Sequence, residues 1–135
     1  MSTMDPADIP IFAALEPKDR DEILGYARRR SYGPGDVIVR EGDRALNLYI
    51  VIAGQVRIEL AGVGQVSTRG PGEFFGEYGL LGDHGRTATV IADDEVTCLL
   101  LPAWEFRSLL DEHPKMAVPM LHEIIERTHP APPTD

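Results

Sequence analysis

The residues best suited to chemistry lie in one glycine-rich stretch, residues 71–89. Glycine is used where the backbone needs a positive φ or where a ligand approaches the main chain closely. Gly76 and Gly79 flank Glu77, so a helical turn that begins near Gly76 would leave N–H groups free to bind an anion. Arg86 adds a planar set of donors suited to a phosphate. The stretch therefore predicts an anion-binding site.

Glu77 narrows the class of ligand. An ionised carboxylate accepts hydrogen bonds but donates none, so it suits a ligand hydroxyl better than a phosphate oxygen. A ribose that carries a phosphate offers both groups close together. Glu77 and Arg86 together therefore predict a sugar phosphate as the ligand.

Two segments of this stretch resemble the phosphate-binding cassette of the cyclic nucleotide-binding domain family. They are Phe75–Gly79 and Arg86–Ala88, and they match the cassette in order and spacing. Tyr78 stands where the family usually has an aliphatic residue, and Gly85 stands where proline often precedes the arginine. Both differences affect the expected shape of the pocket and leave its chemistry unchanged.

The resemblance implies a role for each cassette residue. Glu77 is expected to accept the ribose 2′-hydroxyl, and Arg86 is expected to pair with the cyclic phosphate. Main-chain N–H groups near Gly76 and Gly79 would complete the phosphate site. The function implied is that of a regulatory module that binds a cyclic nucleotide without catalysis and shifts its C-terminal helices in response.

Further ligand contacts are expected around the base. Tyr78 and Thr87 belong to the cassette, and the resemblance implies that a hydroxyl after the arginine can reach the phosphate and the guanine amino group. Relatives with a hydroxyl there also prefer cyclic AMP. We therefore expect the ligand to be cyclic AMP or cyclic GMP, with a slight preference for cyclic AMP. Ile58, Val66 and Ser67 lie in strands that face the nucleotide in the family, where they either contact the base or belong to the barrel core.

Composition limits the class of protein. The 135 residues, 43% of them apolar, are enough for one domain with its own core. A formal charge of −9 argues against direct nucleic-acid binding, which depends on clustered Lys and Arg. No signal peptide or membrane span is evident, so a cytoplasmic location is expected. Cys98 lies in an apolar run and is expected to be a buried thiol.

The remaining sequence predicts a mainly β fold with flanking helices. Short strands separated by glycine-rich turns indicate an antiparallel β-barrel or jelly roll, the double-stranded β-helix of the family. The resemblance extends over residues 9–128, with the barrel at about 32–101 and C-terminal helices at about 102–128. Residues 1–8 are expected to be a loose tail and residues 129–135 a proline-rich tail. The expected strands are Val37–Arg40, Leu46–Ile52, Val56–Leu60, Gln65–Arg69, Ala88–Ala92 and Glu95–Leu101.

Helices are expected before and after the barrel, together with a short cassette helix. The first spans Pro17–Arg29, and Arg28–Arg30 would complement the dipole at its C-terminal end. Pro102–His113 and a segment from Lys115 to about Thr128 form the C-terminal pair. The proline-rich end stops the last helix early, so any lid over the pocket is expected to be short. The apolar face of this helix is marked by Val118, Leu121, Ile124 and Ile125.

Two other functions compete with nucleotide binding. A degenerate barrel that no longer binds nucleotide could serve as an interaction or dimerisation module, with Glu77 and Arg86 paired to each other. A metal-dependent enzyme is disfavoured because the histidines lie in loops and helices without a metal-ligand pattern: His84, His113, His122 and His129. No helix-turn-helix follows the last helix, so the expected partners are a second copy bound through that helix or an unidentified effector protein.

Overall fold

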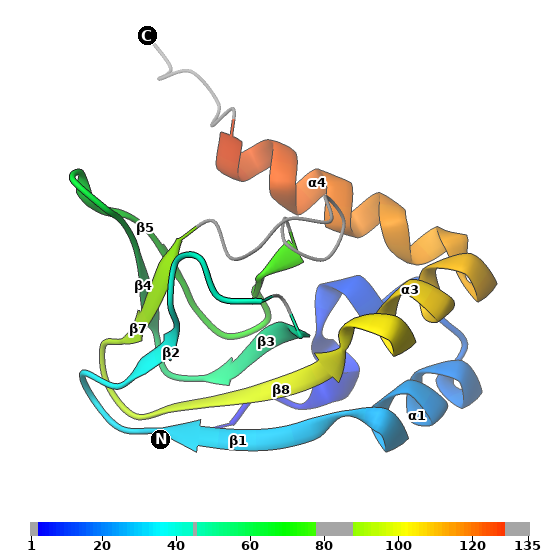
Figure 1. Ribbon diagram of the computed structural model, residues 1–135. Helices are drawn as coiled ribbons and strands as arrows, with labels where there is room; N and C mark the ends of the chain where they lie inside the picture. Colours follow the sequence, from blue (N-terminus) through cyan, green and yellow to red (C-terminus); the bar gives the residue numbers. More distant parts are fainter. Residues whose placement is uncertain (1–2, 45, 78–87, 129–135) are drawn as a thin grey trace, which may run out of the picture.

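The computed structural model describes residues 3–44, 46–77 and 88–128, which form two antiparallel four-stranded sheets and a group of helices (Figure 1). One sheet has the order β1-β8-β3-β6, and the other has the order β2-β7-β4-β5. This jelly-roll arrangement confirms the predicted fold class. The strands of the first sheet are β1 (Arg28–Tyr32), β8 (Val96–Pro102), β3 (Asn47–Ala53) and β6 (Phe74–Phe75). Those of the second are β2 (Val37–Val39), β7 (Thr89–Ala92), β4 (Val56–Leu60) and β5 (Gly64–Arg69).

Strand β3 lies between two apolar cores because successive side chains of a strand point to opposite faces. Leu48, Ile50 and Ile52 belong to the core under the helices, whereas Tyr49 and Val51 belong to the core between the sheets. All five are buried, so this strand reads as a continuous apolar run. Its long pairing with β8 joins the two cores at the centre of the molecule.

Cys98 lies in β8 and belongs to the core between the sheets. Its side chain is buried, and burial raises the pKa of the thiol to about 12. The prediction of a buried thiol is confirmed.

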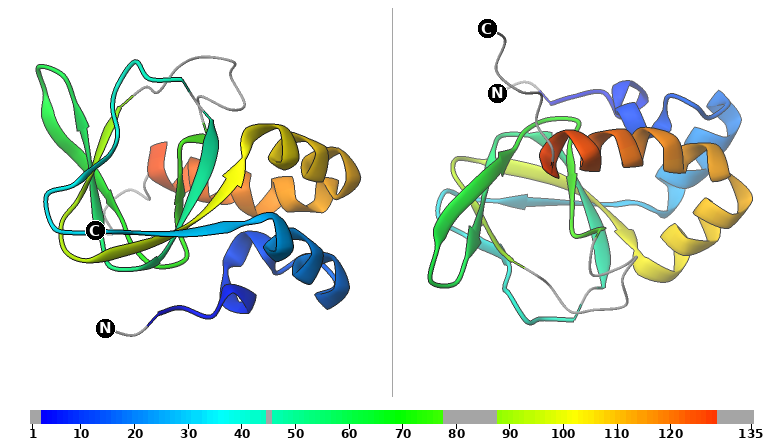
Figure 2. Two further views of the ribbon diagram at one scale, coloured as in Figure 1. Left: turned by 60° about the horizontal axis from the view of Figure 1, so that its bottom comes forward. Right: turned by 90° about the horizontal axis from the view of Figure 1, so that it is seen from above.

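The helices cover one side of the first sheet (Figures 1 and 2). They pack on its apolar face through Ile23, Phe106, Leu109 and Met120. Among the described residues no helix is long and apolar enough to span a membrane. The α-helices are α1 (Pro17–Tyr26), α3 (Ala103–Glu112) and α4 (Ala117–Thr128), and the 3₁₀ helices are η1 (Pro6–Asp8), η2 (Pro10–Phe12) and η3 (Pro114–Met116).

The three consecutive arginines do not end a helix, as the sequence predicted, but form strand β1. Helix α1 stops at Tyr26, and Ala27 already has an extended backbone. Arg28 then pairs with Leu100 and Arg30 with Cys98. The three arginine side chains are exposed. The hydrogen bonds of a sheet edge therefore outweigh the small benefit of basic residues at a helix C-terminus.

The N-terminal segment is docked on the barrel where the sequence predicted a loose tail. The N–H of Met4 donates to the carbonyl of Ile52 at 2.7 Å, and residues 6–8 form η1. Ile9 and Ile11, which follow, are fully buried. Residues 3–8 therefore cover part of the first sheet.

Helix α4 buries a different set of side chains from the one expected. Met120 is buried and Ile124 packs on the same core. Val118, Leu121 and Ile125 are 55%, 55% and 51% exposed. Only Ile124 of the four predicted residues therefore faces the core, and the other three form an exposed apolar stripe.

Candidate functional site

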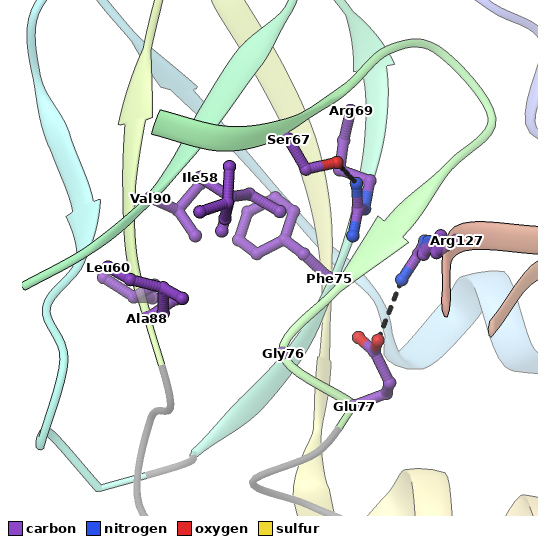
Figure 3. A pocket seen from close by; sticks show the side chains of 12 residues that line it. Ile58, Leu60, Ser67, Arg69, Phe75, Gly76, Glu77, Ala88, Val90 and Arg127 are labelled. Carbon is purple, nitrogen blue, oxygen red and sulfur yellow. Dashed lines mark hydrogen bonds and ion pairs between the residues drawn. The ribbon is translucent and has the colours of Figure 1, made fainter. Parts of the chain in front are cut away.

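A cavity of about 350 Å³ is lined by β2, β4, β5 and β7 of the second sheet, by β6 of the first sheet and by the end of α4 (Figure 3). Its volume is within the range of small-molecule binding sites. The lining residues are Val39, Ile58, Leu60, Val66, Ser67, Arg69, Phe75, Gly76, Glu77, Ala88, Val90 and Arg127.

One wall of the cavity is apolar. Ile58 of β4 and Val90 of β7 lie opposite each other in paired strands. Phe75 of β6 is fixed by stacking on Tyr49, with ring centres 4.9 Å apart and planes 7° from parallel. This wall offers a rigid apolar surface to a flat ligand group.

The chain turns into the cavity directly after β6. Gly76 has φ 91°, a left-handed conformation that favours glycine. Glu77 follows with helical backbone, and its side chain is only 9% exposed. The glycine therefore directs a buried carboxylate into the cavity.

Arg127, near the end of α4, binds this carboxylate. Its Nη1 donates to Oε1 of Glu77 at 2.8 Å. Its Nη2 donates to the carbonyl of Phe74 and to the carboxylate of Glu123, and its guanidinium lies 4.4 Å from the centre of the Phe74 ring. One arginine thus joins the last turn of α4 to both β6 and the acid after it.

Glu123 completes this cluster one helical turn earlier. Its Oε2 also accepts a hydrogen bond from the N–H of Phe74 at 3.2 Å. Burial raises the pKa of Glu123, and the positive charge of Arg127 opposes this rise in part.

A second arginine lines the cavity from β5. Arg69 is 9% exposed, and its Nη1 donates to Oγ of Ser67 at 2.5 Å and to the carbonyl of Thr68 at 2.8 Å. Burial lowers the pKa of Arg69, and the nearby charge of Arg127 lowers it further. In the described part of the chain, no group of His, Cys, Asp and Glu residues could hold a metal ion.

Comparison with known proteins identifies the family. A family model described as "Cyclic nucleotide-binding domain" matches residues 29–113, more than half of the chain. The chain belongs to this family. Domains of the cyclic nucleotide-binding family are non-catalytic regulatory modules, which confirms the prediction that the chain is not an enzyme.

Relatives of this domain occur in several kinds of regulator. The cyclic AMP receptor protein of Thermus thermophilus is 34% identical over 112 residues, which cover 80% of this chain and 52% of that protein. A cAMP-dependent protein kinase regulatory subunit of Hypocrea atroviridis is 36% identical over 103 residues, 76% of this chain and 22% of that protein. The chain thus spans about half or less of the length of these relatives.

A solved structure shares the fold of the domain. The crystal structure of the Thermus thermophilus catabolite activator protein is similar to this chain with a TM-score of 0.76 and 32% identity. The match covers 88% of this chain and 58% of that one.

The cavity brings together five of the predicted site residues of this cyclic nucleotide-binding domain. They come from β4, β5 and the turn after β6: Ile58, Val66, Ser67, Gly76 and Glu77. The other four predicted residues lie outside the described residues: Tyr78, Gly79, Arg86 and Thr87.

Sequence reasoning missed two arginines at the cavity. Arg69 could have been found from strand alternation, because it shares a face with Ser67 two residues earlier. Arg127 lies four residues after Glu123, a spacing at which helical side chains meet. Neither pattern by itself reveals that its arginine faces the cavity.

Proposed function

We propose that the chain is a regulatory module that binds a cyclic purine mononucleotide in the cavity beside Glu77. The observation that carries this proposal is the buried Glu77 carboxylate at a cavity with one apolar wall. The carboxylate suits a ribose hydroxyl and the wall suits a base. Arg86 would supply the cation for the cyclic phosphate. From the cassette sequence, the ligand is cyclic AMP, slightly preferred, or cyclic GMP.

The hydrogen bonding of Glu77 supports a ligand hydroxyl as its second partner. Arg127 donates to Oε1, and Oε2 makes no hydrogen bond to any described residue. A carboxylate accepts several hydrogen bonds, so Oε2 can receive the ribose 2′-hydroxyl while Oε1 keeps the guanidinium. Arg127 would then hold the Glu77 side chain in one orientation before the ligand arrives.

The same contact gives a route from ligand to surface. Glu77 binds the ligand and also binds α4, so a nucleotide that favours one position of Glu77 favours one position of the helix. The exposed stripe of Val118, Leu121 and Ile125 lies on this helix. It offers a surface for a second copy of the chain or for an effector protein.

Residues 9–128 would act as one module, and a cytoplasmic location stays a prediction.

Calorimetry with each cyclic nucleotide tests the proposal. Wild-type protein should bind at least one of the two, and R86A should bind it at least about tenfold more weakly, because a charge-assisted bidentate contact contributes about 1.5–3 kcal/mol. R29A is the matched control, since Arg29 is exposed on β1. Equal affinity of R86A and wild type would exclude the assigned phosphate site.

A second candidate function is favoured by one observation. Glu77 already has a charged partner in Arg127, so the site is electrostatically satisfied without a ligand. A barrel that has lost nucleotide binding and acts only in dimerisation or protein interaction would show this arrangement. It predicts no thermal shift with either nucleotide, together with association of the chain through α4 in sedimentation experiments.

A further inference from the structure

A groove of about 240 Å³ lies between helices α1 and α3, on the helical side of the molecule (Figure 1). It shares no lining residue with the cavity beside Glu77. Side chains one or two turns apart on a helix lie on the same face, so each helix presents one face to the groove. The aromatic and acidic side chains of the groove are Glu22 and Tyr26 of α1 and Trp104, Glu105 and Glu112 of α3.

Two aromatic side chains of the groove are open to solvent. Trp104 is 69% exposed and Tyr26 is 46% exposed. Among the described residues, neither ring stacks on another ring or lies beside a cation. The face of an indole ring carries partial negative charge and attracts cations, most often arginine. The groove therefore offers an unused surface for a cationic group.

The carboxylates of the groove also lack partners. Glu22, Glu105 and Glu112 make no ion pair with a described residue. In addition, Oε2 of Glu105 is buried and has no hydrogen-bond donor among the described residues. A buried acceptor without a donor costs free energy, and a ligand that brings N–H groups removes this cost.

The ends of the two helices give a separate argument for a cation. Tyr26 is the last residue of α1 and Glu112 is the last residue of α3. The unpaired carbonyl groups at a helix C-terminus carry partial negative charge, which basic side chains complement. The last turns of α1 and α3 contain no basic residue. Each helix thus places its C-terminal residue in the groove without a cation to complement its dipole.

We infer that the groove binds an arginine-rich segment of a partner protein. A guanidinium has only donors, pairs with carboxylates and stacks on aromatic faces, so it matches both kinds of side chain in the groove. The formal charge of −9 attracts a basic segment at long range, whereas it repels a second copy of the same chain. The groove is thus an interaction surface separate from nucleotide binding.

Trp104 is the only tryptophan of the chain, so its fluorescence reports on the groove directly. An acetylated hexapeptide of alternating arginine and glycine should shift its emission to shorter wavelength, because the bound peptide covers the exposed indole. The signal should saturate as peptide is added. A hexapeptide with lysine in place of arginine should bind more weakly, because an ammonium group lacks the planar surface that stacks on a ring.

Two pairs of substitutions separate the groove from overall charge. E22Q/E112Q should weaken binding of the arginine peptide about fivefold, since exposed ion pairs contribute little individually. E41Q/E126Q is the matched control, because it makes the same change in net charge at two exposed positions outside the groove. Its affinity should stay close to that of wild type. W104L should also weaken binding, as measured by calorimetry, and thermal unfolding checks that each variant is folded.

The outcomes separate this inference from its alternatives. Equal weakening by E22Q/E112Q and E41Q/E126Q would show that overall charge alone attracts the peptide, and would overturn the inference. A peptide that leaves the emission of Trp104 unchanged would also overturn it. Association of the chain in sedimentation experiments that is lost only in E22Q/E112Q would then assign the groove to a second copy. Nucleotide binding is measured separately, so its failure would leave this inference standing.

Discussion

At the scale of single residues, the site depends on how acidic and basic side chains pair at the C-terminal end of α4. Glu77, Glu123 and Arg127 form one cluster in which the arginine is shared by two acids. The two acids differ in their other partners, because Glu123 also accepts the N–H of Phe74. The cluster is therefore a structural element of the helix attachment as well as of the cavity.

Glu123 gives a prediction about pH. Its pKa in the folded protein is raised above the ordinary value of 4.5, mainly by burial. A raised carboxyl pKa means that the folded state prefers the protonated acid. The stability that this preference contributes is complete below the unfolded pKa and is lost as pH rises through the folded pKa. Relative to E123Q, wild type should be most stable near pH 4 and should lose this advantage as pH rises above 4.5.

Urea unfolding of wild type and E123Q between pH 4 and pH 7 measures this difference. Gln keeps an acceptor for the N–H of Phe74 and does not titrate, so it is the appropriate reference. A wild-type advantage that grows with pH would mean that attraction to Arg127 outweighs burial.

The residue scale also shows what sequence reasoning could and could not reach. Gly76 and Glu77 can be recognised as candidate site residues from the sequence, because their spacing is local and their chemistry is specific. Arg69 and Arg127 were missed because their roles depend on which face of an element meets the cavity. That choice is made by packing between elements distant in the sequence, such as the contact of Arg127 with Phe74.

At the scale of elements, strands with a strong local sequence pattern were predictable, whereas strands that form only because a neighbouring strand pairs with them were less so. The alternating and apolar runs of β3, β4 and β8 and their glycine-rich turns are local signals. The short strand β6 has only two residues, and it exists because Phe74 and Phe75 pair with β3. Strand β1 likewise requires β8 as a partner, so three arginines that suit a helix end became a sheet edge.

The turn between β3 and β4 gives a prediction about stability. Gly54 has φ 81°, and a Cβ there would lie 2.2 Å from the carbonyl oxygen of Glu95. Glu95 lies in the turn between β7 and β8. This turn cannot move away easily, because the Asp94 carboxylate next to Glu95 accepts the N–H of Gln55 at 2.9 Å. G54A should therefore be clearly destabilised.

G62A is the matched control for G54A. Gly62 also has a left-handed backbone, φ 77°, but a Cβ there would meet no atom within 4 Å. G62A therefore carries the backbone strain alone, whereas G54A adds the clash, for which overpacking costs of about 1–3 kcal/mol are typical. If denaturant unfolding showed that G54A and G62A lose the same free energy of unfolding, the close packing of the two turns would be contradicted.

At the scale of the whole molecule, an acidic protein holds a cavity lined by two arginines and one glutamate. The formal charge is −9, yet the described cavity contains Arg69 and Arg127. A cyclic nucleotide is an anion, so under the proposed function it would be repelled at long range by the molecule and attracted only after it enters the cavity. Long-range repulsion between exposed charges is screened by salt, whereas buried contacts are screened much less.

Ionic strength should therefore speed nucleotide association. The screening length falls from about 30 Å at 0.01 M salt to about 8 Å at 0.15 M salt, which removes most of the repulsion between molecule and ligand. Stopped-flow measurements should show an association rate constant that rises over this range. A rate constant that falls with salt would show that the arginines of the cavity govern the approach of the ligand.

Strand β5 is the last strand of its sheet, with β4 as its only described neighbour. The residues that line the cavity from β5, Ser67 and Arg69, thus lie at the edge of the sheet, where fewer strand pairings hold them than in its centre. Glu77, in contrast, is tied to Arg127 and hence to α4. Under the proposed function, substitutions in β5 would adapt the domain to a new base while the contact at Glu77 and the helix attachment are kept, which makes β5 the place to begin when engineering sensors for other nucleotides.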